Sequence, residues 1–208
     1  GLAGVSFAAD EYEDIAELLC VGVPKWVEFV DKDIALAADR DGNINIFDVS
    51  DIFTLTTYTT KTGIKPALPL PGGAGYGMAR DGIYLYTTNN SGTVLDISTP
   101  DTPVVVGGFA NSYRAVNNRI HEDSLGNKYL VCAEYSYGTL GQVEIFDINI
   151  PTAPVPISSI STVPPNGNSE EGWSIAVYND GTDDYLYFAA GFSAPVLFII
   201  DFNNPAAP

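Results

Sequence analysis

The sequence predicts an all-β fold: a β-propeller of about four blades, each blade a four-stranded antiparallel sheet. The first observation is a five-residue unit with a central aspartate, which occurs at residues 46–50, 94–98, 145–149 and 199–203. Its aspartates stand at positions 48, 96, 147 and 201, so the spacing is 48, 51 and 54 residues. Three of the four units run on into a turn with two prolines. Self-similar units of this length on short strands indicate an array of propeller blades.

Composition is the second observation. The 208 residues include 20 glycines, 14 prolines, 12 tyrosines and 10 phenylalanines, a mixture that favours strands and turns over helices. An apolar fraction of 46% is enough for a packed core, and the length suits one domain better than two.

The charge of the chain is strongly acidic. Its 26 aspartates and glutamates stand against 9 lysines and arginines, for a net charge of −17. Phosphate binding needs a basic surface, so nucleic acid and anionic membranes are disfavoured as partners. An acidic exterior keeps a protein in solution and can also hold divalent cations. No apolar run reaches the roughly 18 residues that a transmembrane segment needs.

The chain begins with an expected flexible arm, residues 1–14, and the propeller is expected over residues 15–208. The first residues resemble the end of a secretory signal, with Ser6-Phe7-Ala8 as a small-x-small cleavage site, and an acidic run follows. Residues 15–21 are apolar, and we expect a strand there because the segments before the later blades are also predicted strands.

Each repeat is expected to form one blade, at residues 23–60, 76–109, 113–161 and 173–202. Asp-Gly turns such as Asp41-Gly42 and Asp81-Gly82 join strands as hairpins. The Gly- and Pro-rich linkers 61–74 and 162–171 are expected to be exposed rim loops, where propellers carry binding function. The predicted strands are 26–30, 34–38, 44–49 and 55–59; 76–79, 83–87, 93–97 and 104–109; 114–121, 129–134, 142–148 and 155–160; and 173–177, 185–189 and 196–202.

The fourth predicted blade has only three strands, and strand 15–21 is left over. Pairing of this strand with blade 173–202 would seal a ring and remove two exposed sheet edges. Two alternatives stay open. Either the chain is part of a longer propeller, or the spare strand completes a blade of a neighbouring chain and builds a polymer.

The repeated units resemble LVIVD repeats, a β-propeller family common in secreted and cell-surface proteins of bacteria and archaea. The sequences Ile-Phe-Asp-Val-Ser, Val-Leu-Asp-Ile-Ser-Thr-Pro-Asp-Thr-Pro and Ile-Phe-Asp-Ile-Asn-Ile-Pro-Thr-Ala-Pro carry the resemblance, with tyrosine-rich strands at 83–86 and 185–188. It covers nearly the whole chain from residue 23, although the first unit lacks the two prolines. The resemblance implies a propeller at the cell surface or outside the cell and brings no catalytic residues, because the family shares no catalytic set.

One aromatic residue stands at the start of the first strand of each blade, which gives the set Trp26, Tyr76, Tyr113 and Trp173. On a propeller these positions fall near one face, close to the central channel, where they would bind a sugar ring or an apolar group of a partner. Packing between blades is the alternative.

His121, the single histidine, is the fifth candidate for this ligand site. It lies beside two acidic residues, but a lone histidine supports no zinc or iron site, and a partly exposed histidine at a strand end is the alternative.

Two acidic turns are candidate calcium sites, the first with Asp39, Asp41 and Asn43 and the second with Asp180 and Asp183. Neither has the glycine and glutamate spacing of an EF-hand loop, and ordinary hairpin turns explain both as well. No other cofactor is expected.

Two covalent features are also predicted. Asn89 opens the glycosylation sequon Asn89-Asn90-Ser91. The two cysteines, Cys20 and Cys132, form either a single disulfide or two separately buried thiols.

The sequence therefore predicts a non-catalytic extracellular or cell-surface propeller that acts as a structural or adhesive interaction module. Its partners would be proteins or glycans at the cell surface, and strand exchange through the spare strand would make it a filament subunit. The alternative is a carbohydrate-binding module or a hydrolytic or oxidative enzyme that works from the channel face.

Overall fold

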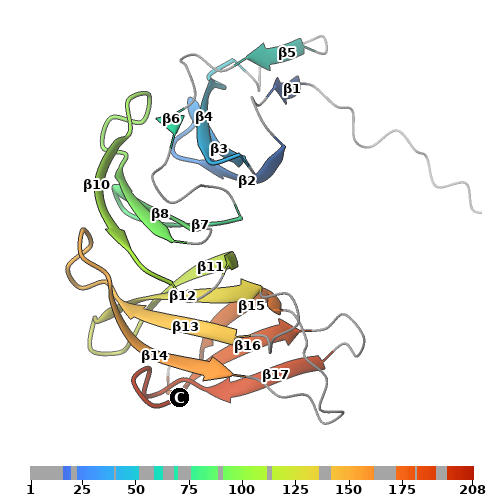
Figure 1. Cartoon of the computed structure of the whole chain (residues 1–208). Coiled ribbons are helices and arrows are strands. Elements are labelled where there is room, and N and C mark those ends of the chain that lie inside the picture. The colour runs from blue at the N-terminus through green and yellow to red at the C-terminus, as the bar shows by residue number, and fades with distance from the viewer. Residues whose placement is uncertain are drawn as a thin grey trace, which may run out of the picture.

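The computed structural model of the chain describes residues 16–19, 23–39, 41–51, 59–62, 68–69, 76–88, 91–111, 114–135, 142–161, 172–180, 182–190 and 196–208. Within these ranges the chain forms strands and turns and no helix, and hence no helix that is long and apolar enough to cross a membrane (Figure 1). Three antiparallel sheets have four strands and one has three. The four sheets follow one another around an arc (Figure 1).

The strands of each sheet pair in the order of the chain, except that the first sheet skips one strand between its third and fourth members. The first sheet holds β2 (Pro24–Phe29), β3 (Ile34–Asp39), β4 (Asn43–Asp48) and β6 (Leu68–Pro69). The second holds β7 (Gly77–Asp81), β8 (Tyr84–Thr88), β9 (Gly92–Asp96) and β10 (Val104–Phe109). The third holds β11 (Arg114–Glu122), β12 (Lys128–Tyr135), β13 (Gln142–Asp147) and β14 (Val155–Ser161). The fourth holds β15 (Gly172–Asn179), β16 (Asp184–Ala190) and β17 (Val196–Asp201).

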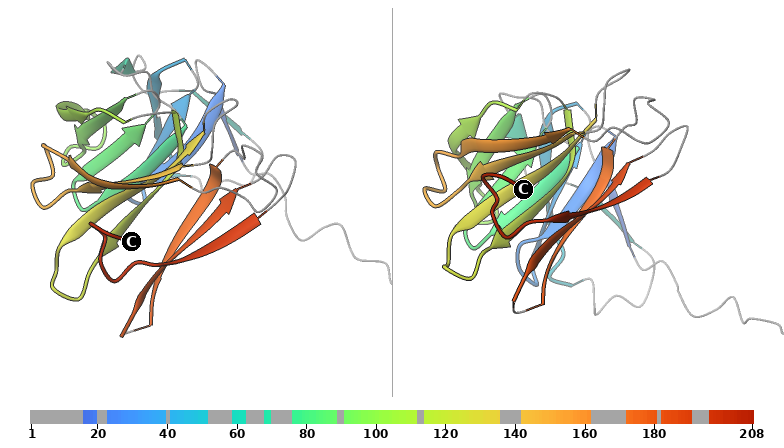
Figure 2. Two further views of the ribbon diagram at one scale, coloured as in Figure 1. Left: turned by 60° about the horizontal axis from the view of Figure 1, so that its bottom comes forward. Right: turned by 90° about the horizontal axis from the view of Figure 1, so that it is seen from below.

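Successive sheets pack face to face, because neighbouring residues of one strand serve two interfaces. Leu85 packs towards the first sheet and Tyr86 towards the third. In the same way Leu130 packs towards the second sheet and Val131 towards the fourth. Side chains alternate between the two faces of a strand, so a sheet covered on both sides has apolar residues at consecutive positions. From two further directions the sheets stand side by side as separate layers (Figure 2).

Each repeated aspartate ends its strand in the same way. Its Oδ1 accepts a hydrogen bond from the backbone N–H two residues later, as predicted from the turn chemistry of aspartate. The residue between them is buried, and its own N–H donates to a carbonyl of the adjoining hairpin. The four bonds are Ser50 N to Asp48 (2.9 Å), Ser98 N to Asp96 (2.8 Å), Asn149 N to Asp147 (2.8 Å) and Asn203 N to Asp201 (3.0 Å).

Two expectations about strand pairing are wrong. β1 (Ala16–Leu19) pairs in parallel with β5 (Thr59–Thr62), and not with the fourth sheet. The fourth strand of the first sheet is β6, whereas most of the expected strand 55–59 lies outside the described residues. The physical reason is the first repeat unit, which lacks the proline pair that leads the chain directly into β10 and β14 in the next two sheets.

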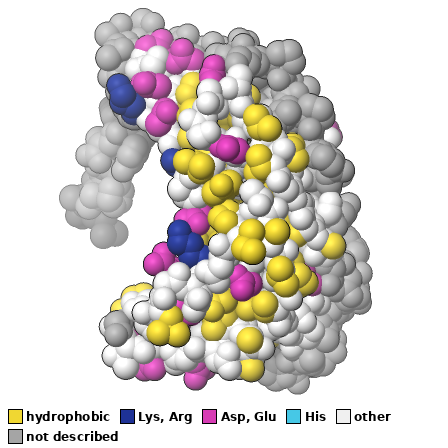
Figure 3. All heavy atoms as spheres, turned by 90° about the vertical axis from the view of Figure 1, so that its left-hand side faces the viewer, with side chains coloured by type: hydrophobic (Ala, Val, Ile, Leu, Met, Phe, Trp, Pro, Cys, Tyr) yellow, Lys and Arg dark blue, Asp and Glu magenta, His cyan; other side chains and the backbone are white. Residues whose placement is uncertain are grey.

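The outer edge strands are exposed and apolar. On β10 the side chains of Val104, Val105 and Val106 are exposed, and on β14 so is Val155. On the side of the arc where β10 lies, hydrophobic side chains spread over the surface with acidic ones among them (Figure 3). Such edges offer unpaired backbone groups to other strands.

The acceptor role of the repeated aspartates is testable at Asp147. Asp147→Ala removes the oxygen that binds the N–H of Asn149 and is expected to lower the free energy of unfolding by about 1 kcal/mol. Asp147→Asn keeps a side-chain oxygen at that place and should cost roughly half as much or less. Urea denaturation followed by circular dichroism measures both, and equal losses would contradict the acceptor role.

Candidate functional site

The first strands β2, β7 and β11 converge on the inside of the arc (Figure 1). Two of the expected aromatic residues on or beside these strands contact cations. The guanidinium carbon of Arg114 lies 4.9 Å from the ring centre of Tyr76, and Nζ of Lys25 lies 5.7 Å from the same centre. The guanidinium carbon of Arg119 lies 5.5 Å from the ring of Trp26. We call these five residues the inner cation cluster. Cations from other sheets, rather than open space, stand at both rings.

The fold holds the two rings in place from behind. Trp26 is half-buried and packs on the cluster between the first and second sheets. Tyr76 is half-buried too, and its backbone N–H donates to the carbonyl of Thr88 over 3.2 Å. Blade packing, the alternative reading of these aromatics, thus accounts for part of the Trp26 side chain.

The close approach of β7 and β11 depends on a glycine. A Cβ at Gly77 would lie 2.8 Å from Oδ1 of Asn118, so no other side chain fits there without movement. Oδ1 of Asn118 accepts a hydrogen bond from the Thr88 hydroxyl over 3.0 Å. Two buried donors beside this contact have no hydrogen-bond partner: Nδ2 of Asn118 and Nε of Arg114.

Glu28 is the acidic group that faces this cluster. Burial raises its pKa, and the charges of Arg80 and Arg119 oppose that rise. Arg80 itself is held by carbonyl groups, because its Nε donates to Gly82 over 2.9 Å and its Nη1 to Val30.

The other expected members of the ligand site lie elsewhere or cannot be placed. Tyr113 lies outside the described residues, and so does the side chain of Trp173, whose backbone belongs to β15. His121 is at the opposite end of β11 from Arg114 and is only 5% exposed, so both its placement beside the aromatics and the alternative of a partly exposed histidine are wrong.

His121 serves the interface between the third and fourth sheets. Its Nε2 lies 3.3 Å from Oδ2 of Asp184, and its ring packs edge-on against Phe202 and beside Tyr129. Both partners of the His–Asp pair are buried. Sequence reasoning missed this contact because Asp184 is 63 positions away, at the start of a strand in another repeat.

The acidic turns bind their own backbone. Oδ1 of Asp39 accepts from the N–H groups of Asp41 and Asn43, each over 3.0 Å. Burial raises the pKa of Asp39, but hydrogen bonds from Asn45, Asn43 and Asp41 outweigh it and hold the value below the ordinary one.

The second turn is built alike. Backbone N–H groups of Asp183 and Thr182 lower the pKa of Asp180. Within the part of the chain that the structure describes, no group of three acidic, histidine or cysteine side chains is placed to hold a metal ion. Calcium binding stays a prediction from the sequence, and the turn geometry explains these aspartates without it.

The covalent predictions fall partly outside the described residues, which include neither Asn89 nor Cys20. Cys132 is a free and fully buried thiol, which fits the alternative of separately buried thiols at this position, whereas Cys20 cannot be placed. Burial raises the pKa of the Cys132 thiol well above its ordinary value, and the charges of Glu134 and Glu144 add to the rise.

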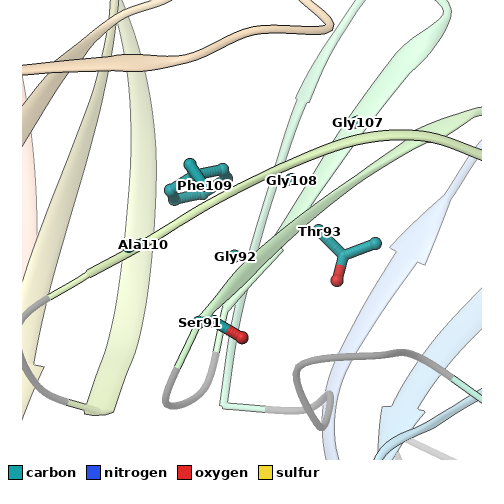
Figure 4. A pocket seen from close by; sticks show the side chains of 7 residues that line it. All are labelled: Ser91, Gly92, Thr93, Gly107, Gly108, Phe109 and Ala110. Atoms are coloured by element: carbon teal, nitrogen blue, oxygen red, sulfur yellow. The ribbon is translucent and has the colours of Figure 1, made fainter.

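A groove opens between β9 and β10 (Figure 4). Its floor is largely glycine backbone, and the ring of Phe109 lies so close over Gly92 that a Cβ there would be 2.0 Å away. No charged side chain lines the groove, so it offers no group for acid–base chemistry. The lining residues are Ser91, Gly92, Thr93, Gly107, Gly108, Phe109 and Ala110.

A second candidate surface is the outward face of the fourth sheet, which we call the terminal face. The residue two positions before each repeated aspartate is Ile46, Val94, Ile145 or Ile199. The first three are 3%, 0% and 0% exposed because the next sheet covers them, whereas Ile199 is 63% exposed. Leu197 on the same face is 60% exposed. Tyr178, Tyr185 and Tyr187 share this face by strand register.

Comparison with solved structures establishes the fold. The chain matches the β-propeller domain of Myceliophteria thermophila Cps50 (Swd1) with a TM-score of 0.58 at 16% identity, over 88% of this chain and 53% of that domain. The chain is a β-propeller. It also matches the computationally designed Ika4 protein with a TM-score of 0.57 at 11% identity, over 91% of this chain and 98% of that protein. The chain thus spans about half the length of the first of these structures.

These likenesses confirm the predicted all-β propeller with about four blades, and at such identities they bear on the fold alone. No protein-family model and no curated protein match the sequence. The resemblance to LVIVD repeats therefore stays a prediction.

The packing role of His121 predicts a stability effect. His121→Ala leaves a cavity beside Phe202 and removes the contact of Nε2 with Oδ2 of buried Asp184, so we expect the free energy of unfolding to fall by about 3 kcal/mol. Tyr178→Ala, at a residue that is 55% exposed, should change it by less than about 0.5 kcal/mol. Similar losses for both variants in urea denaturation would show that His121 is not an interface residue.

The raised pKa of Cys132 predicts a loss of stability at alkaline pH. The native state holds the thiol protonated, so stability is intact below the ordinary value of 9.0 and falls as the pH rises above it. Cys132→Ala should lack this part of the pH dependence between pH 8 and about 10.5. A thiol reagent should label Cys132 only after unfolding, and failure of any thiol to react in unfolded, unreduced protein would contradict the free thiol.

Proposed function

We propose that the propeller is a non-catalytic interaction module that binds another β-structured surface through its terminal face. The exposure of Ile199 at a position that is covered in the three other repeats carries the proposal. Burial of Ile199 and Leu197 against such a surface would contribute roughly 1.5–3 kcal/mol for each side chain.

The covered faces of the first three sheets indicate the shape of the partner. Ile46 is covered by Leu85 and its neighbours, and Ile145 by the cluster that contains Leu186 and Phe188. A complementary surface would therefore be a flat sheet with aliphatic and aromatic side chains. The outer edge of β17 has no further strand among the described residues, so it can also accept one.

The adhesive role, the extracellular or cell-surface location and self-assembly into filaments are parts of the same proposal. The acidic composition, the exposed apolar faces and the resemblance to LVIVD repeats support them. We assign the module no catalytic role, because the inner cation cluster makes cation–aromatic contacts and the His121–Asp184 pair packs between two sheets.

Self-association through the terminal face is testable by light scattering coupled to size exclusion. We expect concentration-dependent oligomers of the wild-type chain that are lost in the double variant Leu197→Asp/Ile199→Asp. Val155→Asp, a matched control on the exposed edge strand β14, should retain them.

A version of the protein that lacks residues 1–22 separates the two routes to assembly. Retained oligomers indicate contact through the terminal face, and lost oligomers indicate exchange of strand 15–21. A wild-type chain that stays monomeric at high concentration, or equal loss in the Val155→Asp control, would rule out the terminal face as a site of self-association.

A further inference from the structure

We propose that the inner cation cluster binds a ligand that carries two or more carboxylates. The cluster comprises Lys25, Arg114 and Arg119 with the rings of Trp26 and Tyr76. This site is separate from the terminal face, and its occupation does not depend on whether that face binds a partner.

Within the part of the chain that the structure describes, the two arginines form no ion pair, although the charge of Arg119 acts on Glu28 from beyond contact distance. Two of the described cations, Lys32 and Lys128, form ion pairs with carboxylates. Lys128, for example, lies 2.6 Å from Asp81. Among the described residues, no carboxylate oxygen lies within 4.0 Å of Arg114 or Arg119. Their positive charge is therefore left available on the inside of the arc.

Leaving these cations unpaired is costly because they are partly removed from water. Both arginines are half-buried, and Nε of Arg114 is buried without a hydrogen-bond partner. Contact of a cation with an aromatic ring contributes roughly 1–2 kcal/mol of stabilisation, which is less than the cost of fully desolvating the charge. A bound carboxylate would supply the missing partner.

The donors that remain suit a carboxylate. A guanidinium group has five N–H donors and binds a carboxylate through two parallel hydrogen bonds. Nη1 of Arg119 donates a hydrogen bond to the carbonyl oxygen of Asn118 over 2.7 Å. Nδ2 of Asn118 is a further buried donor without a partner, on the same strand between the two arginines. The aromatic rings fix the guanidinium planes before a ligand arrives, which lowers the entropy cost of binding.

The charge of the whole chain limits the size of the ligand. A net charge of −17 repels an extended polyanion at long range, whereas charges beyond about 8 Å are screened at physiological salt. A short ligand is attracted by the local cations once it is within that distance. Because the cations stand at two separate rings, held by three sheets, the ligand needs at least two carboxylates. A small dicarboxylate and a short acidic peptide share this chemistry.

Isothermal titration calorimetry of the full chain with glutarate and with the tripeptide Glu-Glu-Glu tests the proposal. Sodium chloride at matched ionic strength and the tripeptide Lys-Lys-Lys serve as blanks. Arg114→Gln and Arg119→Gln are each expected to weaken binding about tenfold. Lys32→Gln removes the same charge from a side chain that is 86% exposed, and should change the affinity by less than about twofold. Glu28→Gln, which removes the opposing acid, should tighten binding.

The outcomes separate cleanly. Binding of glutarate alone assigns a small dicarboxylate, and tighter binding of Glu-Glu-Glu assigns an acidic peptide; both support the site. No binding of either probe, or an equal effect of Lys32→Gln, overturns it. Nuclear magnetic resonance of the wild-type chain tests the proposal without variants, so a variant that fails to fold does not affect the result. On addition of ligand the Nε–Hε signals of Arg114 and Arg119 must shift while that of Arg80, already bound to Gly82, stays; unmoved Arg114 and Arg119 signals overturn the proposal.

Discussion

The structure depends on apolar packing between the broad faces of successive sheets. Each middle sheet is a layer with neighbours on both sides, so consecutive residues such as Leu85 and Tyr86 stabilise different interfaces. An isolated blade of this kind would expose both faces to water and would not be stable alone. The exposed apolar residues of the fourth sheet and the cations of the inner strands, which form no ion pair with the described carboxylates, are both consequences of how the four layers are arranged.

Charge is distributed unevenly over this framework. The acidic side chains that define the repeat bind backbone N–H groups at strand ends, as Asp96 and Asp201 do. They are structural and surround the molecule with negative potential. The first strands, in contrast, bring Lys25, Arg114 and Arg119 towards the inside of the arc. In the proposed site, local cations on an otherwise acidic molecule would favour small anions over large ones.

The repeat made the fold predictable, because period, turn chemistry and apolar faces all point to the same architecture. The aspartate turns and the strands β10 and β13 lie within one residue of their expected places. The predictions that were wrong concern contacts between residues that are far apart in the sequence. The parallel pairing of Ala16 with Thr59 has no local signal, and neither has the burial of His121 against Asp184. The aromatic positions Trp26 and Tyr76 were predictable, but the arginines that cover them come from another repeat and carry no motif.

The parallel pair β1–β5 has a consequence for the order in which the chain acquires its structure during synthesis. β1 leaves the ribosome before its partner, residues 59–62, which follows about 40 residues later. At translation rates of about 5–20 residues per second, β1 waits several seconds, while β2, β3 and β4 pair with strands made immediately before or after them. β1 therefore waits longer for its partner than these strands do, and for that interval it is accessible to chaperones.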